Sequence, residues 1–325
     1  MRRAARSTAS LRPSRPVARI PLGAGRSIRL WQEDALLALP RRAPRPSVVV
    51  TSPPYNRRVP YRGYDDARPR DDYLGWMRRL GEAVAEVLAD DGSFFLNVGG
   101  SPSDPWFPWD VARAAGRPFV LQNVLHWIKS IALGGTDGTG APVAYGHYKP
   151  LVSARYVHGA HEYIFQFTRR GDVPLDRLAV GVPYQDRSNV RRWRRPASEL
   201  RCRGNTWFLP YPTIRDRERD RPHPATFPVE LPEWCVRLHG VHRTRQLVDP
   251  FVGIGSSAVA AARLGVDFVG FDLDAGYLEV AARRVRAELE ARRAVRVLAS
   301  RVRSRPSARP TPPRTAGSSS SSASA

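Results

Sequence analysis

Two consecutive prolines directly after an apolar run constrain this chain more than any other feature of its sequence. Residues 48–50 are three valines, as expected of a strand that is buried on both faces. Pro53 and Pro54 cannot donate hydrogen bonds to a neighbouring strand, so the strand must end and the backbone must leave the sheet. Ser52 and Tyr55 flank them, which predicts carbonyl acceptors, a hydroxyl and an aromatic ring where open α/β sheets bind ligands. The alternative is a proline turn with a packed tyrosine.

The rest of the chain alternates buried strands with amphipathic helices, which predicts an α/β fold. Apolar residues recur at helical spacing after Asp72, an expected N-cap, and form the buried face of a helix that extends to Leu88. Further helices are expected at residues 228–239, 258–264 and 275–290. Strands are expected at residues 27–30, 93–98, 120–128, 162–167, 246–249 and 268–271.

A glycine-rich turn follows the strand that ends at Asp249. Gly253 and Gly255 permit a tight turn and a close approach to a ligand, and the helix behind them presents free N–H groups. Asp272 ends the next strand, where a carboxylate accepts hydrogen bonds from ribose hydroxyls. A glycine loop alone is weak evidence, and a purely structural turn is the alternative. The acid at the adjacent strand end favours a nucleoside-binding half-unit.

The net charge of +22 is concentrated at the two ends of the chain. Residues 1–29 and residues 292–325 each contain eight arginines and no acid, so the body between them carries only +6. Two basic arms favour a polyanionic partner, with unselected solvated tails as the alternative. We expect residues 1–26 and the basic tail 292–325, which is rich in Pro and Ser, to be disordered.

Residues 131–222 form a less regular region with 16 Lys and Arg against 9 Asp and Glu. A core strand is expected near 162–168. Basic residues interleaved with aromatic ones suit phosphate contact and base stacking, with a solvated irregular insert as the alternative. The candidate DNA-binding residues here are Arg191, Arg192, Trp193, Arg194 and Arg195.

The two turns together resemble a known family. Thr-Ser-Pro-Pro-Tyr at 51–55 and Asp-Pro-Phe-x-Gly-x-Gly-Ser-Ser at 249–257 are similar to the motifs of amino-group-specific DNA methyltransferases, in the permuted order of the β group. The resemblance implies a Rossmann-like, S-adenosylmethionine-dependent methyltransferase sheet. Its catalytic half would be residues 27–130, its target-recognition insert 131–222 and its cofactor-binding half 223–291.

The resemblance also implies roles for individual residues. Ser52 and the Pro53 carbonyl would bind the target amino group, and Tyr55, after Pro54, would stack on the extruded base. Trp127 is a candidate second wall of that pocket, with core packing as the alternative. The cofactor pocket would be formed by Asp34, His223, Phe227, Asp249, Phe251, Gly253, Gly255, Ser256, Ser257 and Asp272.

The implied reaction is direct methyl transfer to an exocyclic amine of a flipped-out base, without a metal. Methylation at cytosine C5 needs a cysteine nucleophile, and neither Cys202 nor Cys235 follows a proline. Serine at the first motif position favours cytosine N4, with adenine N6 as the alternative. Methylation of RNA or protein amides and a non-catalytic DNA-binding relic also remain open.

The setting expected for such an enzyme is the bacterial or archaeal cytoplasm. No apolar run is long enough to cross a membrane, and two distant cysteines indicate neither a disulfide framework nor a zinc site. The expected partners are double-stranded DNA and, as a further candidate, a cognate restriction endonuclease.

Overall fold

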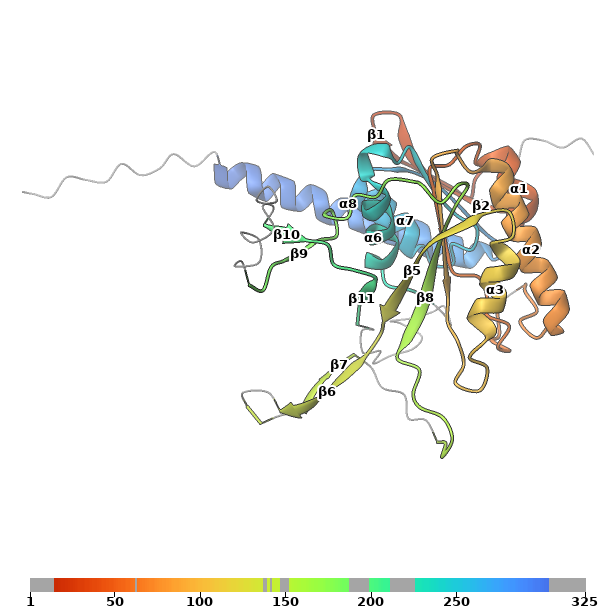
Figure 1. Cartoon of the computed structure of the whole chain (residues 1–325). Coiled ribbons are helices and arrows are strands. Elements are labelled where there is room, and N and C mark those ends of the chain that lie inside the picture. The colour runs from red at the N-terminus through yellow and green to blue at the C-terminus, as the bar shows by residue number, and fades with distance from the viewer. Residues whose placement is uncertain are drawn as a thin grey trace, which may run out of the picture.

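A nine-stranded sheet forms the centre of the part of the chain that the computed structural model describes (Figure 1). The described residues are 15–61, 63–136, 139–140, 142–146, 152–186, 199–210 and 226–303. The strand order is β1-β2-β13-β12-β3-β4-β8-β5-β11. The bounds are β1 (Ala18–Gly23), β2 (Arg26–Gln32), β3 (Val48–Thr51), β4 (Ser93–Val98), β5 (Val120–Ile128), β8 (His161–Thr168), β11 (Thr206–Phe208), β12 (Gln246–Asp249) and β13 (Asp267–Asp272).

Helices cover both faces of this sheet. On one face lie α1 (Ala35–Arg42), α2 (Arg70–Val87) and α3 (Phe107–Ala115), and on the other α6 (Glu230–His239), α7 (Ser256–Leu264) and α8 (Ala275–Arg303). The three valines of β3 show why the strand is apolar throughout: Val49 packs in the core beneath α2, whereas Val48 and Val50 pack in the opposite core. The predicted α/β fold with buried parallel strands is therefore confirmed.

The direction of the strands determines which residues meet at the site. Strands β3, β4, β12 and β13 pair in parallel, so their carboxyl ends lie at one edge of the sheet. Strand β8 runs antiparallel to both β4 and β5. Its first residues, not its last, therefore lie beside the carboxyl ends of its neighbours, with Glu162 opposite Trp127.

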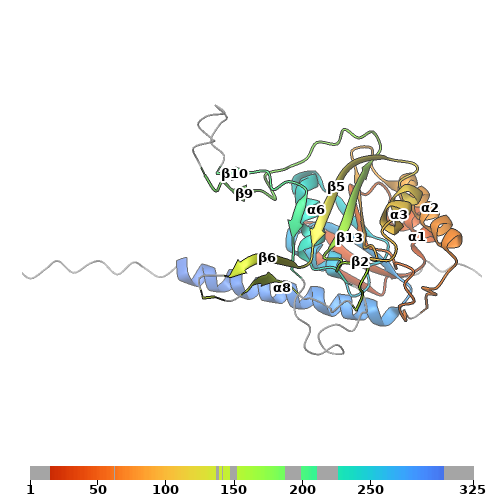
Figure 2. The ribbon, with the colours of Figure 1, turned by 60° about the horizontal axis from the view of Figure 1, so that its bottom comes forward.

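The described parts of region 131–222 form separate excursions from the sheet rather than one compact insert. Strands β6 (Ile131–Thr136) and β7 (Pro142–Tyr145) form a hairpin that projects beyond the carboxyl end of β5 (Figure 1). Strands β9 (Val182–Pro183) and β10 (Leu200–Arg201) pair elsewhere, and the two hairpins stand apart in both ribbon views (Figure 2). The expected core strand is confirmed as β8, and β11 is a second one, with Trp207 fully buried.

Three expectations about element ends are wrong. Residues 1–26 were expected to be disordered, but Ala18–Gly23 pairs with β2 as β1, burying Ala18 and Ile20. The tail was expected to begin at residue 292, but α8 continues to Arg303 because its arginine-rich last turns contain no helix-breaking residue. Residues 1–14 and 304–325 lie outside the described residues.

The third correction concerns the start of α2. The helix begins at Arg70 after Pro69, so Asp72 lies in its first turn and is not the N-cap. Acidic side chains in a first turn stabilise a helix through its dipole without capping it. Among the described residues, no helix combines the length and the apolar character needed to span a membrane.

Candidate active site at the carboxyl edge of the sheet

A cavity at the carboxyl edge of the sheet brings together most of the predicted catalytic and cofactor-binding residues. It lies where β3, β12 and β13 end, between the proline turn and the glycine turn. The predicted residues that line it are Asp34, Ser52, Pro53, Pro54, Tyr55, Phe227, Phe251, Gly253, Ser256 and Asp272. The two motifs, about two hundred residues apart in the sequence, thus form one site, as parallel strands that end at the same edge require.

The loop between β3 and α2, residues 56–69, supplies lining residues that the sequence did not indicate. Tyr61, Tyr64 and Arg68 of this loop line the cavity. Asp66 orders the loop, because its carboxylate accepts hydrogen bonds from the backbone N–H groups of Asn56, Arg57 and Val59.

Asp249 is not part of the cavity wall, contrary to its expected role. Its side chain is buried, with 1% exposed, between the two motifs. Oδ1 accepts hydrogen bonds from Thr51 Oγ1 at 2.7 Å and from the Phe251 N–H at 3.0 Å, and Oδ2 accepts one from Ser257 Oγ at 2.5 Å. Burial raises the pKa of Asp249 to about 6, although these hydrogen bonds act in the opposite direction. Asp249 and Ser257 therefore connect the strand end to the glycine turn from behind.

The two glycines of the turn have different functions. Gly255 has a φ of 83°, and a Cβ atom built there would lie 2.6 Å from the Cβ of Ala281 on α8. Its lack of a side chain therefore permits close packing against α8. Gly255 is not among the residues that line the cavity, contrary to the prediction. Gly253 does line the cavity, and its N–H donates to Asp272 Oδ2 at 3.0 Å.

The hydroxyls of Ser52 and Tyr55 belong to a buried polar network. Their oxygen atoms lie 2.6 Å apart. The Tyr55 hydroxyl is also 3.0 Å from Glu162 Oε2 and accepts a hydrogen bond from Asn97 Nδ2 at 2.8 Å. Glu162 in turn accepts hydrogen bonds from Asn97 Nδ2 at 2.8 Å and from Lys129 Nζ at 3.1 Å.

The electrostatics of this network keep Tyr55 neutral and Glu162 ionised. Burial and the nearby Glu162 carboxylate raise the pKa of Tyr55 well above its usual value. Burial alone would raise the pKa of Glu162, but the Lys129 charge and the hydrogen bonds from Asn97 and Tyr55 outweigh it and hold that pKa below its usual value.

Sequence reasoning missed Asn97, Lys129 and Glu162. Each was counted only as part of, or next to, an apolar strand. The available signal was a polar residue at the site end of a buried strand: Asn97 interrupts the apolar run of β4, and Glu162 is the second residue of β8. For Glu162 that signal is ambiguous in the sequence, because the first residues of a strand lie at the site only if the strand is antiparallel to its neighbours, as β8 is.

The remaining predicted residues either have a structural role or lie outside the described residues. Trp127 is 2% exposed, packs in the core and donates its Nε1 hydrogen to the Leu209 carbonyl at 2.8 Å, so the core alternative is correct. Asp34 lines the cavity and also caps α1 by accepting from the Leu36 N–H. His223 and residues 191–195 lie outside the described residues.

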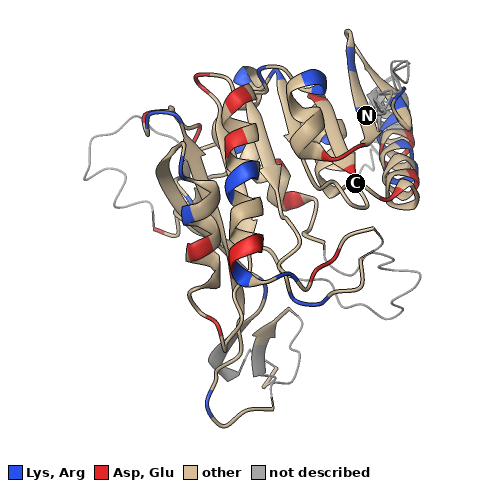
Figure 3. Ribbon diagram, turned by 90° about the vertical axis from the view of Figure 1, so that its right-hand side faces the viewer, with Lys and Arg blue, Asp and Glu red and all other residues tan. Residues whose placement is uncertain are grey.

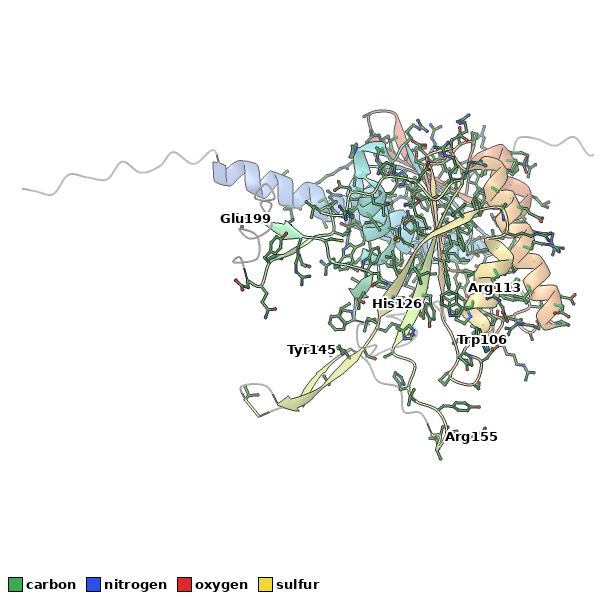
Figure 4. All side chains as sticks on the ribbon, in the orientation of Figure 1. Trp106, Arg113, His126, Tyr145, Arg155 and Glu199 are labelled. Atoms are coloured by element: carbon green, nitrogen blue, oxygen red, sulfur yellow. The ribbon has the colours of Figure 1, made fainter. Side chains whose placement is uncertain are left out.

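Exposed aromatic and basic side chains extend from the same end of the molecule as the hairpin of β6 and β7. Figure 4 shows Trp106, Tyr145 and Arg155 there. Trp106 is 68% exposed and Tyr145 is 55% exposed, although both are large apolar residues. The Arg155 guanidinium lies over the ring of Tyr156.

The cavity suits a cofactor that joins a nucleoside to a cation. Phe251 and Tyr64 offer aromatic faces, and the Tyr64 hydroxyl is buried with no hydrogen-bond partner among the described residues. The Asp34 and Asp272 carboxylates suit ribose hydroxyls and a positive charge. The tight turn at Gly253, with a φ of 49°, brings the backbone close to such a ligand.

The glycine turn, Asp272 and the proline turn all face one cavity at the edge of a Rossmann-like sheet. This combination defines the class of S-adenosylmethionine-dependent methyltransferases. The chain belongs to the DNA methylase family, whose profile matches residues 47–283. The family comprises enzymes that methylate the exocyclic amino groups of cytosine or adenine. The predicted family and cofactor are confirmed.

Individual relatives agree with this assignment. The type II methyltransferase M.BglII of Bacillus subtilis is 26% identical over 253 residues, covering 72% of this chain and 62% of the relative. The DNA adenine methyltransferase YhdJ of Escherichia coli is 25% identical, covering 78% of this chain and 80% of YhdJ. The structure of the cytosine-N4-specific PvuII DNA methyltransferase matches with a TM-score of 0.57 at 18% identity, over 84% of this chain and 89% of that one.

Proposed function

We propose that this protein transfers the methyl group of S-adenosylmethionine to the exocyclic N4 of a cytosine flipped out of double-stranded DNA. The observation that carries the proposal is the placement of the Ser52 hydroxyl, held against Tyr55 at the wall of the cavity beside Pro53. A hydroxyl next to a proline carbonyl matches the two hydrogens of a planar amino group.

The chain's own residues supply orientation rather than a nucleophile. Bound S-adenosylmethionine supplies an electrophilic methyl group on a sulfonium. The lone pair of an exocyclic amine is delocalised into the base, so the amine is a poor nucleophile. Ser52 Oγ and the Pro53 carbonyl would accept the amino hydrogens and favour a nitrogen whose lone pair points out of the ring plane. The Tyr55 ring would stack on the extruded base and offset part of the cost of unstacking it.

The cofactor would lie against the other half of the cavity. Asp272 would accept from the ribose hydroxyls, Asp34 would lie near the adenine, and Phe251 would pack against the adenine face. Gly253 and Ser256 would approach the ligand through the backbone, with Phe227 beside them. Asp249, Ser257 and Gly255 would support this half from behind.

Adenine N6 is the second candidate target, because both bases present the same arrangement of amino group and ring nitrogen. The 25% identity to YhdJ, an adenine methyltransferase, favours it. Serine at position 52, rather than aspartate or asparagine, favours cytosine. Three exposed residues at the end of the molecule from which the hairpin projects would contact DNA outside the cavity, namely Trp106, Tyr145 and Arg155. The similarity to M.BglII supports a restriction endonuclease as a functional partner.

Product identification tests the proposal. Purified protein is incubated with labelled S-adenosylmethionine and unmethylated genomic DNA, and the digested nucleosides are identified by mass spectrometry. We expect labelled N4-methylcytosine. Labelled N6-methyladenine would refute the cytosine assignment and retain the site, and labelling of RNA alone would refute DNA as the substrate.

A Ser52→Ala variant tests the proposed role of that hydroxyl. We expect it to lose about 100-fold or more in kcat, because it removes one of two acceptors for the amino group. Its Kd for S-adenosylmethionine, measured by calorimetry, should stay close to that of the wild type. A variant with wild-type kcat would contradict the assignment of Ser52.

A further inference from the structure

We infer that Glu162 sets the direction of the hydroxyl hydrogens in the active site, so that Ser52 presents only hydrogen-bond acceptor capacity to the target base. The inference rests on the proposed function. It makes Glu162 a positioning residue, through which the site selects a target base with an amino group over one with a carbonyl group at the same position. Glu162 is contributed by β8, on the far side of β4 from β3, the strand that Ser52 follows.

The argument begins with the surroundings of the Tyr55 hydroxyl, which has one hydrogen to donate. Its neighbours are Glu162 Oε2 at 3.0 Å, the Asn97 carbonyl at 3.2 Å, Asn97 Nδ2 at 2.8 Å and Ser52 Oγ at 2.6 Å. Asn97 Nδ2 is a donor only, so it takes none of this hydrogen. Of the acceptors, the Glu162 carboxylate forms the strongest hydrogen bond because it is charged.

The direction of the Ser52 hydrogen follows from that of Tyr55. Two oxygens 2.6 Å apart need one hydrogen between them. The Tyr55 hydrogen is directed at Glu162, so the hydrogen between Tyr55 and Ser52 comes from Ser52. One of the two remaining lone pairs of Ser52 Oγ faces Asn97 Nδ2, which lies 3.3 Å away. The other is left to accept a hydrogen bond in the cavity that Ser52 lines.

The carboxylate is itself held in one state and one place. Lys129 lies 3.1 Å from Glu162 Oε1 and leaves Oε2 for Asn97 and Tyr55. The side chain of Glu162 is only 14% exposed, so solvent provides little alternative hydrogen bonding. Asn97, which also donates to Glu162 Oε2, is neutral and adds no second charge beside the carboxylate. A glutamine at position 162 would not fix the direction of the hydroxyl hydrogens. Its amide N–H can donate to the Tyr55 oxygen, and the hydrogens of Tyr55 and Ser52 could then point the opposite way.

The discriminating measurement compares binding of two duplexes that differ in one group at the target position. The site is the one mapped by product identification, and it carries either cytosine or uracil, whose C4 carbonyl replaces the amino group. For an adenine target, hypoxanthine takes the place of uracil. We expect wild-type protein to prefer the amino-bearing base and Glu162→Gln to reduce that preference about 10-fold, with kcat reduced about 100-fold.

Three further variants make the test specific. Tyr55→Phe breaks the middle of the chain of hydrogen bonds, and we expect the same loss of preference. In Ser52→Ala the preference is already lost, so adding Glu162→Gln should change it no further. Glu82→Gln is the matched control, because Glu82 is an exposed residue of α2 paired with Arg78, and it should retain wild-type kcat and preference.

The outcomes separate the inference from the proposed function. Wild-type protein that methylates DNA, with Glu162→Gln or a folded Tyr55→Phe that keeps the full preference for the amino group, overturns the inference alone. Wild-type protein that transfers no methyl group to DNA overturns the proposed function and the inference with it. A melting temperature for each variant shows that the fold is intact, and Tyr55→Phe decides the question where Glu162→Gln does not fold.

Discussion

Asp249 shows at the scale of a single residue how a motif position differs from a ligand contact. Its two oxygens accept hydrogen bonds from Thr51 and Ser257 and from the backbone of Phe251, so that one carboxylate connects the ends of two neighbouring strands to the first turn of α7. A residue in a glycine-loop motif thus contributes to the site by fixing the loop.

The raised pKa of Asp249 predicts a stability that depends on pH. The folded-state pKa of about 6 exceeds the ordinary value of 3.8, so the folded protein binds the proton more tightly than the unfolded chain. The contribution of Asp249 to the free energy of unfolding is therefore fully present below about pH 4. It decreases as the pH rises to about 6, by roughly 3 kcal/mol at most.

Urea denaturation of wild type and Asp249→Asn at several pH values measures how the free energy of unfolding changes with pH and so checks this prediction. Asparagine does not titrate, so the stability of the variant relative to wild type should improve between pH 4 and pH 6.5. Asp267→Asn serves as a control for a partly buried carboxylate at the other end of the neighbouring strand. A difference between Asp249→Asn and wild type that is independent of pH would contradict the raised pKa.

Gly255 allows a second prediction at this scale. In Gly255→Ala the new Cβ would meet Ala281 of α8 at 2.6 Å in a backbone with φ of 83°. We expect a loss of about 3 kcal/mol in the free energy of unfolding, from backbone strain and overpacking together. Gly265→Ala is the matched control, since Gly265 also has a positive φ but open space around it, and it should cost only about 1 kcal/mol.

Loop 56–69 is the element that the sequence explained least. Asp66 organises it, and Tyr61, Tyr64 and Arg68 line the cavity. Asn56 adds a second brace, because its side chain bonds to the backbone of Arg68 in both directions. Local propensity could not show this, since the hydrogen bonds join residues about ten positions apart.

Asp66→Asn should weaken cofactor binding without unfolding the protein. An amide oxygen accepts fewer and weaker hydrogen bonds from the three backbone donors than a carboxylate does, so the loop should cover the cavity less completely. We expect the Kd for S-adenosylmethionine, measured by calorimetry, to rise about 10-fold, which equals about 1.4 kcal/mol. Asp65→Asn, at an exposed neighbour, should leave the Kd unchanged, and an equal effect of both substitutions would refute the role of Asp66.

Most regular elements followed from apolar spacing, because the apolar faces of the predicted helices and of most predicted strands are buried. Strand β5 is an exception, since Val120 and Leu121 at its start are exposed. Several described elements were missed, among them helices α1 and α3 and strands β1 and β11. Helices α1 and α3 each contain a proline, and β11 is only three residues long. The cavity walls from the two motifs were predicted, whereas Glu162 and Lys129 required the order of strands in the sheet. Strand order depends on pairing across the whole chain and has no local signal.

At the scale of the whole molecule, charge is distributed unevenly between the body and the ends. Basic and acidic side chains are interspersed over the described body (Figure 3), in keeping with the +6 that remains between the two arginine-rich segments. Long-range attraction to DNA is therefore expected to depend on the terminal arginines, while the site itself determines which base reacts.

Deleting residues 2–14 tests this division. The segment carries four arginines and ends before β1, so the sheet should remain intact. Each arginine that contacts a phosphate contributes about 0.9 to the slope of log K against log salt concentration, so the slope should become shallower by up to about 3.6. Deleting residues 315–325, which contain no charged side chain, is the control and should leave the slope unchanged. Identical slopes for both deletions and wild type would show that the first arm does not contact DNA.

The ion pair between Lys129 and Glu162 joins the two ends of the segment that contains the hairpin of β6 and β7, where the segment leaves β5 and returns to β8. The backbone reinforces this closure, because the Lys129 N–H donates to the Ala160 carbonyl at 2.8 Å. The chain therefore leaves the sheet after Lys129 and returns to it beside the same residue, at Glu162. We therefore expect segments of other lengths and sequences to be tolerated between Ser130 and Ala160. Such a replacement leaves Lys129, Glu162 and the residues of the cavity unchanged. Under the proposed function, preference for a DNA sequence and methyl transfer are then carried by separate parts of the chain, which can evolve or be engineered independently.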